Sequence, residues 1–228
     1  MRERALQAVL FDMDGLAVDT EHAWLTVEHE VADWLGAPWG PEHQAALVGG
    51  SLEATSGYLR DRGNRVVPTA DIAARLLTGM VERVRRFGAP ERPGIRTLLA
   101  EVRRAGLPSA LVSASHRALV DAVLAATGLA FDVTVAGDEV GRTKPAPDPY
   151  LRAAELLDAD PRRCVVLEDS PNGVAAGEAA GCVVVGVPNI VPLLPGPART
   201  IVASLEELSV PALAALVAAG VSNNSPRS

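Results

Sequence analysis

Short runs of mostly apolar, often β-branched residues recur along the chain and alternate with segments of helical spacing. The runs lie at residues 8–11, 110–113, 133–136, 164–167 and 183–187. A short continuous apolar run is typical of a strand that is buried on both faces. Between the runs, apolar residues recur three and four apart, for example at Ile95, Leu98, Leu99 and Val102. Strands that alternate with helices predict an α/β fold, in which helices cover both faces of a parallel sheet.

The interval between the first two strands is too long for a simple crossover connection. About 95 residues separate them, and residues 36–41 and 88–94 of this interval carry the Pro and Gly of turns. Other positions within it have the apolar spacing of a helix, namely Trp24, Val27, Val31, Trp34 and Leu35. We therefore expect a discontinuous core, formed by residues 1–15 and 89–228, with a helical insertion at residues 16–88.

Residues that begin or end helices agree with this division. Asp148 is expected to cap the helix that has Pro149 in its first turn, and Gly106 and Gly128 fall where the preceding helices should stop. The polar stretch at residues 222–228 is expected to be a disordered tail.

Charge and composition exclude several classes of protein. The sequence has 28 acidic and 21 basic residues and a formal net charge of -7, so it lacks the basic surface that binds nucleic acid or anionic membranes. It has no apolar run of about 18 residues that would span a membrane, and the apolar run near its start is too short for a secretory signal. Cys164 and Cys182 lie at the edges of apolar runs, which favours buried reduced thiols. A cytoplasmic protein fits these features.

Two acids follow the first predicted strand. In an extended segment, side chains two residues apart point the same way, so Asp12 and Asp14 should face one site while Met13 points away. Gly15 lets the backbone pass close to a ligand, and the carboxyl ends of strands are the usual ligand site of open α/β sheets. Alone, the Asp-x-Asp-Gly string fits a turn with exposed acids almost equally well.

A second acidic pair, Glu168 and Asp169, follows the predicted strand at residues 164–167 and should open onto the same edge of the sheet. Carboxylate oxygens suit Mg²⁺, which binds through one or two carboxylates and bridges to a phosphate. Zinc is disfavoured because the sequence has no cluster of His and Cys. The alternative is a solvated loop at residues 168–173. This alternative is the weaker one, because the second acidic pair is expected at the same edge of the sheet as the first.

Two further segments carry groups that suit an anion. Ser113 ends the second strand, where its hydroxyl and the amide groups that follow can donate to an oxyanion at a helix N-terminus. A plain helix cap is a common role for a serine and would be favoured for Ser113 taken by itself. Ser115 is a candidate for that cap. Lys144 precedes Pro145, which disfavours helical backbone at the lysine, so its ammonium group can point towards the acids.

These motifs together resemble the haloacid-dehalogenase-like hydrolase superfamily, in the branch with a helical cap inserted after the first strand. Nearly the whole chain takes part. The motifs are Asp12-Met13-Asp14-Gly15, Ser113 in Val-Ser-Ala-Ser, Lys144 before Pro-Ala-Pro-Asp, and Glu168-Asp169-Ser170, in the order of the family. The resemblance implies a Rossmann-like core and is greatest to the sugar-phosphate phosphatases and β-phosphoglucomutases.

The resemblance also implies roles for the motif residues. Asp12 would be the nucleophile that forms an aspartyl-phosphate, and Asp14 the general acid and base. Mg²⁺ would be held by Asp12, the main-chain carbonyl of Asp14, and Asp169, with Glu168 as a further ligand or as an anchor behind the ligands. Three further groups, the Ser113 hydroxyl, the Ala114 amide and Lys144, would bind the transferring phosphoryl oxygens.

Differences from the motifs of particular family members indicate which reaction this chain catalyses. Dehalogenases lack the second acid, which is present here as Asp14. The mutases use a cap histidine, and its position falls on Trp24, since His22 is two residues too early. An arginine that the mutases have after Gly49-Gly50-Ser51 is replaced by Leu52. Both departures favour hydrolysis over mutase activity.

Specificity is expected to depend on the cap, through Trp24 and Leu52, and on His116 and Arg117 beside the phosphate site. Trp24 also fits the apolar stripe of its helix, so a core role carries equal weight. The sequence therefore predicts a Mg²⁺-dependent phosphatase of small phosphorylated metabolites, with sugar or polyol phosphates foremost, acting as a monomer. The alternatives are a β-phosphoglucomutase-like mutase and a non-catalytic phosphate-binding protein.

Overall fold

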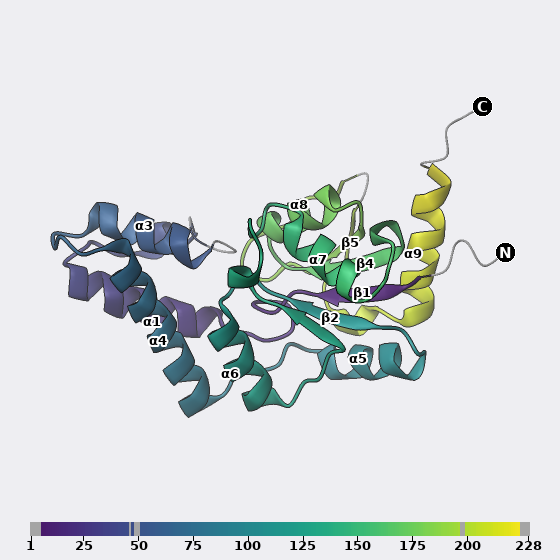
Figure 1. The fold of residues 1–228 in the computed structure, drawn as a ribbon, viewed down its shortest axis with the longest axis horizontal. Helices are drawn as coiled ribbons and strands as arrows, with labels where there is room; N and C mark the ends of the chain where they lie inside the picture. Colours follow the sequence, from purple (N-terminus) through teal and green to yellow (C-terminus); the bar gives the residue numbers. More distant parts are fainter. Residues whose placement is uncertain (1–5, 46, 48–50, 197–198, 224–228) are drawn as a thin grey trace.

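A computed structural model describes residues 6–45, 47, 51–196 and 199–223. The chain forms two parts that lie side by side (Figure 1). One part is a group of helices, and the other is a sheet with helices on both of its faces.

The sheet has six parallel strands in the order β3-β2-β1-β4-β5-β6 among the described residues. Its strands are β1 (Ala8–Phe11), β2 (Ser109–Val112), β3 (Val133–Val135), β4 (Cys164–Glu168), β5 (Val183–Gly186) and β6 (Arg199–Ile201). The chain proceeds from β1 to one edge and then returns to build the other side from β4. A crevice forms outside the carboxyl ends of the strands where the strand order reverses in this way, here beside β1.

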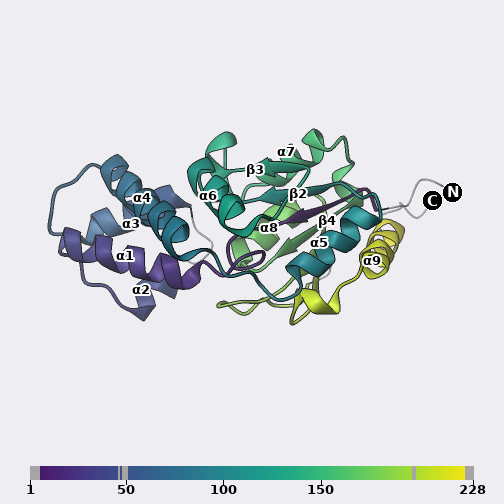
Figure 2. The same ribbon diagram turned by 90° about the horizontal axis from the view of Figure 1, so that it is seen from below.

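Alternate side chains of β1 enter two different apolar cores beneath the helices that cover the sheet. These helices are α5 (Ile95–Arg104), α6 (Arg117–Thr127), α7 (Asp148–Leu156), α8 (Pro171–Ala179) and α9 (Val210–Asn223), with 3₁₀ turns at Gly137–Glu139, Pro161–Arg163 and Leu205–Glu207. Val9 and Phe11 belong to the larger core, which also contains residues of α5, α6, α9 and the cap, while Ala8 and Leu10 face α7 and α8. Figure 2 shows α5 and α9 together on one side of the sheet. This two-sided burial of a parallel sheet confirms the predicted Rossmann-like fold class.

The helices between β1 and β2 form the cap. They are α1 (Glu21–Leu35), α2 (Pro41–Ala45), α3 (Leu52–Arg62) and α4 (Thr69–Phe87), and all lie within the range predicted for the insertion. Helix α1 buries Val27, Val31 and Leu35, and α4 buries Leu76 and Met80, as their apolar spacing requires. Both views show α4 running beside α6, and the two helices are in extensive contact, so α4 docks the cap onto the core (Figures 1 and 2).

Some predicted helix boundaries differ from the structure. Asp148 is the first residue of α7 rather than its cap, and its carboxylate accepts hydrogen bonds from Arg142. Helix α6 is preceded by His116, so Ser115 does not cap it. Helix α9 continues to Asn223, so the tail predicted from residue 222 starts inside a helix, and its remaining residues, 224–228, lie outside the described ones.

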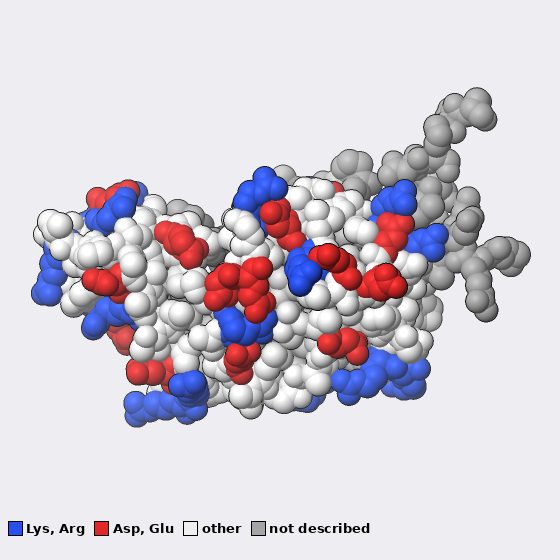
Figure 3. All heavy atoms as spheres, viewed as in Figure 1, with Lys and Arg blue, Asp and Glu red and all other residues white. Residues whose placement is uncertain are grey.

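Figure 3 shows acidic and basic side chains interspersed over one face of the molecule, without a continuous basic patch on that face. No helix within the described ranges combines the length and the apolar character that crossing a membrane needs.

Candidate active site

A cavity lies where the cap meets the carboxyl ends of the central strands. Most of the residues predicted for the site line it: Asp12, Asp14, Ala114, His116, Lys144 and Asp169 from the core, and Trp24 and Leu52 from the cap. Ser113 and Glu168 are fully buried behind its wall. The predicted side chains are therefore brought together, with the exception of Arg117.

Lys144 links two of the acids. It is the only lysine in the sequence, and its Nζ donates to Asp12 Oδ1, to Glu168 Oε1 at 2.7 Å and to the carbonyl oxygen of Val112 at 2.9 Å. An ammonium group has three N–H donors, so these contacts engage all of them. Burial opposes the charge of Lys144, but Asp12 and Glu168 outweigh burial and raise its pKa above the usual range. Lys144 therefore stays charged and holds the carboxylates of Asp12 and Glu168 in place.

Both carboxylate oxygens of Glu168 are occupied. Besides Lys144, Oε1 accepts from the hydroxyl of Tyr150 at 2.6 Å, while Oε2 accepts from the amide of Asp169 and from the amide and hydroxyl of Ser170 at 3.1–3.2 Å. A Cβ atom on Gly173 would lie 1.7 Å from Glu168 Oε1, so only glycine fits beneath it. These contacts fix Glu168 in one position.

Three buried acids form a cluster that suits a metal ion. One carboxylate oxygen from each of Asp12, Glu168 and Asp169 lies within 4.8 Å of the others. Burial, followed by the charge of neighbouring carboxylates, raises the pKa of Asp12 and of Asp169 well above the ordinary value. Oxygen ligands, burial and an excess of negative charge are the features that a hard divalent cation requires. The donor set therefore fits Mg²⁺, although other divalent cations share these preferences.

Gly15 lets the backbone pass directly beside this cluster. Its φ of 85° is unfavourable for other residues, and a Cβ atom would lie 2.0 Å from Asp169 Oδ2. The close neighbour of Gly15 in the structure is therefore the carboxylate of Asp169.

Asp14 is held by donors from both the cap side and the core. Its Oδ1 accepts from Thr20 Oγ1 at 2.6 Å and, over a longer 3.4 Å, from Trp24 Nε1. Its Oδ2 accepts from the hydroxyls of Ser115 at 2.9 Å and Ser113 at 3.1 Å. These contacts orient the carboxylate towards the cavity that Asp14 lines.

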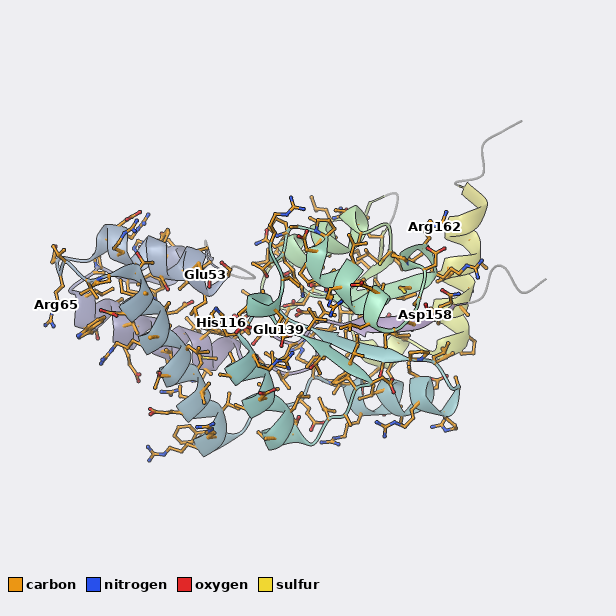
Figure 4. The ribbon with its side chains drawn as sticks, in the orientation of Figure 1. Glu53, Arg65, His116, Glu139, Asp158 and Arg162 are labelled. Carbon is orange, nitrogen blue, oxygen red and sulfur yellow. The ribbon has the colours of Figure 1, made fainter. Side chains whose placement is uncertain are left out.

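His116 and Arg117, which were both predicted to determine specificity, lie in different surroundings. His116 lines the cavity, and its Nε2 atom lies 2.9 Å from Glu53 Oε1 of the cap. Figure 4 shows these two side chains on either side of the boundary between cap and core. The guanidinium group of Arg117 is instead bound to Glu139, to Asp121 and to Thr134. The structure thus corrects the expectation for Arg117, because these partners hold it outside the cavity lining.

The sequence analysis did not find several of the groups at this site. Thr20 and Tyr150 are isolated residues whose contacts depend on tertiary packing, and no local pattern marks them. Glu21 and Glu28 also line the cavity. Their signal was present in the sequence, because positions three and four residues from Trp24 share its helix face.

Comparison with known proteins agrees with this geometry. The family model described as haloacid dehalogenase-like hydrolase matches residues 6–181. The chain belongs to this family. Hexitol phosphatase A of Escherichia coli (strain K12) is 36% identical over 183 residues, which cover 78% of this chain and 81% of the relative.

Solved structures of CbbY from Rhodobacter sphaeroides have the same fold. The complex with phosphate has a TM-score of 0.80 and 31% identity, and covers 89% of this chain and 96% of CbbY. A mutant of CbbY in complex with xylulose-(1,5)-bisphosphate has a TM-score of 0.79 and 32% identity over the same shares. Together with the family match, these likenesses confirm the predicted family and its inserted cap, and the relatives named as phosphatases support phosphatase activity.

Proposed function

We propose that the chain is a Mg²⁺-dependent phosphatase that hydrolyses small phosphorylated metabolites through a phosphoryl group carried on Asp12. One observation carries this proposal: Asp12 is buried at the end of the central strand, in contact with Lys144 and clustered with Glu168 and Asp169. A carboxylate so placed has a cation on one side and a metal-binding cluster on the other. It faces the cavity in which a substrate would bind.

In the first step, a carboxylate oxygen of Asp12 attacks phosphorus, and the bond between phosphorus and the leaving oxygen breaks. Asp14 gives its proton to that oxygen, so a neutral alcohol leaves. In the second step, water attacks the phosphorus of the aspartyl-phosphate while Asp14 takes a proton from the water. The bond between phosphorus and Asp12 then breaks, which releases inorganic phosphate and restores the carboxylate.

The surrounding groups hold the phosphoryl oxygens. The Ser113 hydroxyl, the Ala114 amide and Lys144 are the donors assigned to this task. Because the three N–H groups of Lys144 already have acceptors, the phosphoryl group would share one of them. Lys144 therefore serves mainly to position Asp12 and to offset charge, as phosphoryl transfer requires.

Asp12 and Asp169 would hold the metal, together with the main-chain carbonyl of Asp14. Glu168 supports them from behind, because both of its oxygens already accept hydrogen bonds. Bound Mg²⁺ supplies positive charge that offsets the acids and the phosphate.

The substrate proposed is a sugar or polyol phosphate, which agrees with the name of hexitol phosphatase A. Water is the proposed acceptor rather than a second sugar oxygen. Trp24 lies beside Asp14, where a mutase requires a histidine by the family resemblance, and an indole cannot exchange the proton that this transfer needs.

Release of inorganic phosphate from p-nitrophenyl phosphate with Mg²⁺ tests the proposal. Asp12→Asn should lower kcat by at least about 10³-fold, because the amide is not a nucleophile. Asp71→Asn, at an exposed position of α4, is the matched control and should turn over normally. If the wild-type chain releases no phosphate with any divalent metal, the proposal is wrong. Conversion of β-glucose 1-phosphate to glucose 6-phosphate, without free phosphate, would instead identify a mutase.

A further inference from the structure

Helix α1 presents a row of three side chains to the cavity. Glu21, Trp24 and Glu28 are three and four residues apart, so they share one face of the helix, and all three line the cavity. This face lies next to Asp14, to which Trp24 donates at 3.4 Å. The row therefore lies where the leaving group of a substrate would sit.

Glu28 is the unusual member of this row. It is only 6% exposed, and its carboxylate forms no hydrogen bond or ion pair with any residue in the described part of the chain. Because Glu28 lines the cavity, its carboxylate is largely withdrawn from bulk water and has only the cavity in front of it, and such loss of hydration without a partner costs free energy. Thr55, Leu52 and Leu77 line the cap wall of the same cavity and bring no charge to it.

Both basic residues in the described lining of the cavity already have acidic partners. Among the described lining residues, Lys144 and His116 are the basic ones, and both belong to the core. Lys144 is bound to Asp12 and Glu168, and His116 contacts Glu53. A second phosphate on a leaving group would therefore meet acids and apolar side chains on the cap wall, without a cation to receive it.

This inference rests on the proposed function. We propose that Glu28 determines specificity by hydrogen-bonding hydroxyl groups of the leaving group, so that the enzyme accepts monophosphates of uncharged polyhydroxylated compounds and rejects bisphosphates. An uncharged polyol offers hydroxyl groups that both donate and accept. Such groups can satisfy a buried carboxyl group without a counter-ion.

The ionisation of the row is consistent with an uncharged ligand. Burial, followed by the charge of Glu21, raises the pKa of Glu28 to about 8. At neutral pH, Glu28 therefore carries a proton, and it offers both a donor and an acceptor. A cationic leaving group would find less negative charge here than the number of acids implies.

Three variants and four substrates test the proposal. The substrates are sorbitol 6-phosphate, p-nitrophenyl phosphate, fructose 1,6-bisphosphate and phosphoethanolamine, compared by kcat/KM. In the wild type we expect sorbitol 6-phosphate to exceed the bisphosphate by at least about 100-fold, because a buried unpaired phosphate is strongly disfavoured. Glu28→Leu should lower the ratio of sorbitol 6-phosphate to p-nitrophenyl phosphate by about 10-fold or more, chiefly through KM.

The conservative and control variants separate recognition from packing. Glu28→Gln keeps a donor and an acceptor, so its ratio should stay within about 3-fold of the wild type. Glu30→Gln removes an acid from the exposed side of the same helix and should leave the ratio unchanged. Thermal unfolding of each variant verifies that the fold is retained.

Several outcomes would overturn the inference. An unchanged ratio in Glu28→Leu, a wild-type preference for the bisphosphate, or a preference for phosphoethanolamine would each show that Glu28 does not select hydroxyl groups. These results would leave the proposed phosphatase activity intact, because p-nitrophenyl phosphate would still be hydrolysed. Absence of turnover on p-nitrophenyl phosphate would instead defeat the proposed function and this inference with it.

Discussion

His116 of the core and Glu53 of the cap meet at the boundary between the two parts, with Nε2 and Oε1 2.9 Å apart (Figure 4). Ser115, next to His116, donates to Asp14, and Leu52, next to Glu53, lines the cap wall. The contact therefore joins the core wall of the cavity to its cap wall. Burial opposes ionisation of Glu53, but hydrogen bonds, first that of His116, lower its pKa below the ordinary value.

Removing this contact should loosen the cap rather than unfold the protein. The Glu53 side chain is 66% exposed, and exposed ion pairs contribute at most about 1 kcal/mol. We expect Glu53→Gln to raise KM about 2–5-fold and to reduce its dependence on NaCl, because salt screens such a pair. Glu82→Gln, an exposed position of α4, is the control. An identical salt dependence of KM in Glu53→Gln and in the wild type would rule out a role for the pair in cap closure.

Lys144→Met should destabilise the metal-free protein. The substitution keeps an unbranched side chain, one atom shorter, but leaves Asp12 and Glu168 buried without their cation, which costs about 3–5 kcal/mol. Urea unfolding monitored by tryptophan fluorescence measures this loss. Turnover should fall by at least about 10³-fold. A variant as stable as the wild type would show that the acids do not depend on Lys144.

The same lysine offers a chemical readout. Because it is the sole lysine and its side chain is 3% exposed, an amine-reactive acylating reagent should modify it in the unfolded chain and spare it in the folded one. Mass spectrometry of peptides that contain residue 144 checks this. Rapid modification under native conditions would contradict the burial of Lys144.

Glu28 should make stability depend on pH. Burial raises its pKa from 4.5 to about 8, so its contribution is fully present below pH 4.5 and is lost as the pH rises through 8. Glutamine does not ionise, so Glu28→Gln should gain about 1–3 kcal/mol over the wild type between about pH 5 and pH 9. Melting temperatures across this range measure the gain, with Glu30→Gln as control. Parallel pH profiles for Glu28→Gln and the wild type would exclude this contribution.

Mg²⁺ should stabilise the protein through the acidic cluster. At about 100 times its Kd, a ligand that binds only the folded state adds about 2.7 kcal/mol, which for a chain of this size corresponds to about 5–10 °C in Tm. Asp169→Asn should abolish the Mg²⁺-dependent shift, whereas Asp71→Asn should keep it. Retention of the full shift in Asp169→Asn would show that Mg²⁺ binds elsewhere.

The sequence predicts those structural features that depend on local pattern and strand order. Asp12 and Asp14 follow β1, while Glu168 is the last residue of β4 and Asp169 follows it. Parallel strands end at one edge of the sheet, so the convergence of these acids follows from local pattern and topology. Strand β6 escaped prediction because its three residues, which include Arg199, are only partly buried at the edge of the sheet.

Side-chain partners are harder to predict because they depend on packing between distant segments. Arg117 immediately follows a residue that lines the cavity, yet Glu139 and Thr134 of the adjacent segment hold its guanidinium group. Tyr150 reaches Glu168 only because α7 packs on the sheet beside β4. Neither relationship has a signature in the neighbouring sequence.

The position of β1 in the sheet also governs the order in which this molecule can be completed. Val9 pairs with Ser109 and Ala8 pairs with Cys164, so its partner strands follow 100 and 156 residues later. During synthesis the whole cap emerges before either partner strand. Until then β1, which is apolar and immediately precedes Asp12, has no strand to pair with. A nascent chain that has reached only the end of the cap lacks Glu168 and Asp169, so the acidic cluster cannot assemble until β4 has left the ribosome.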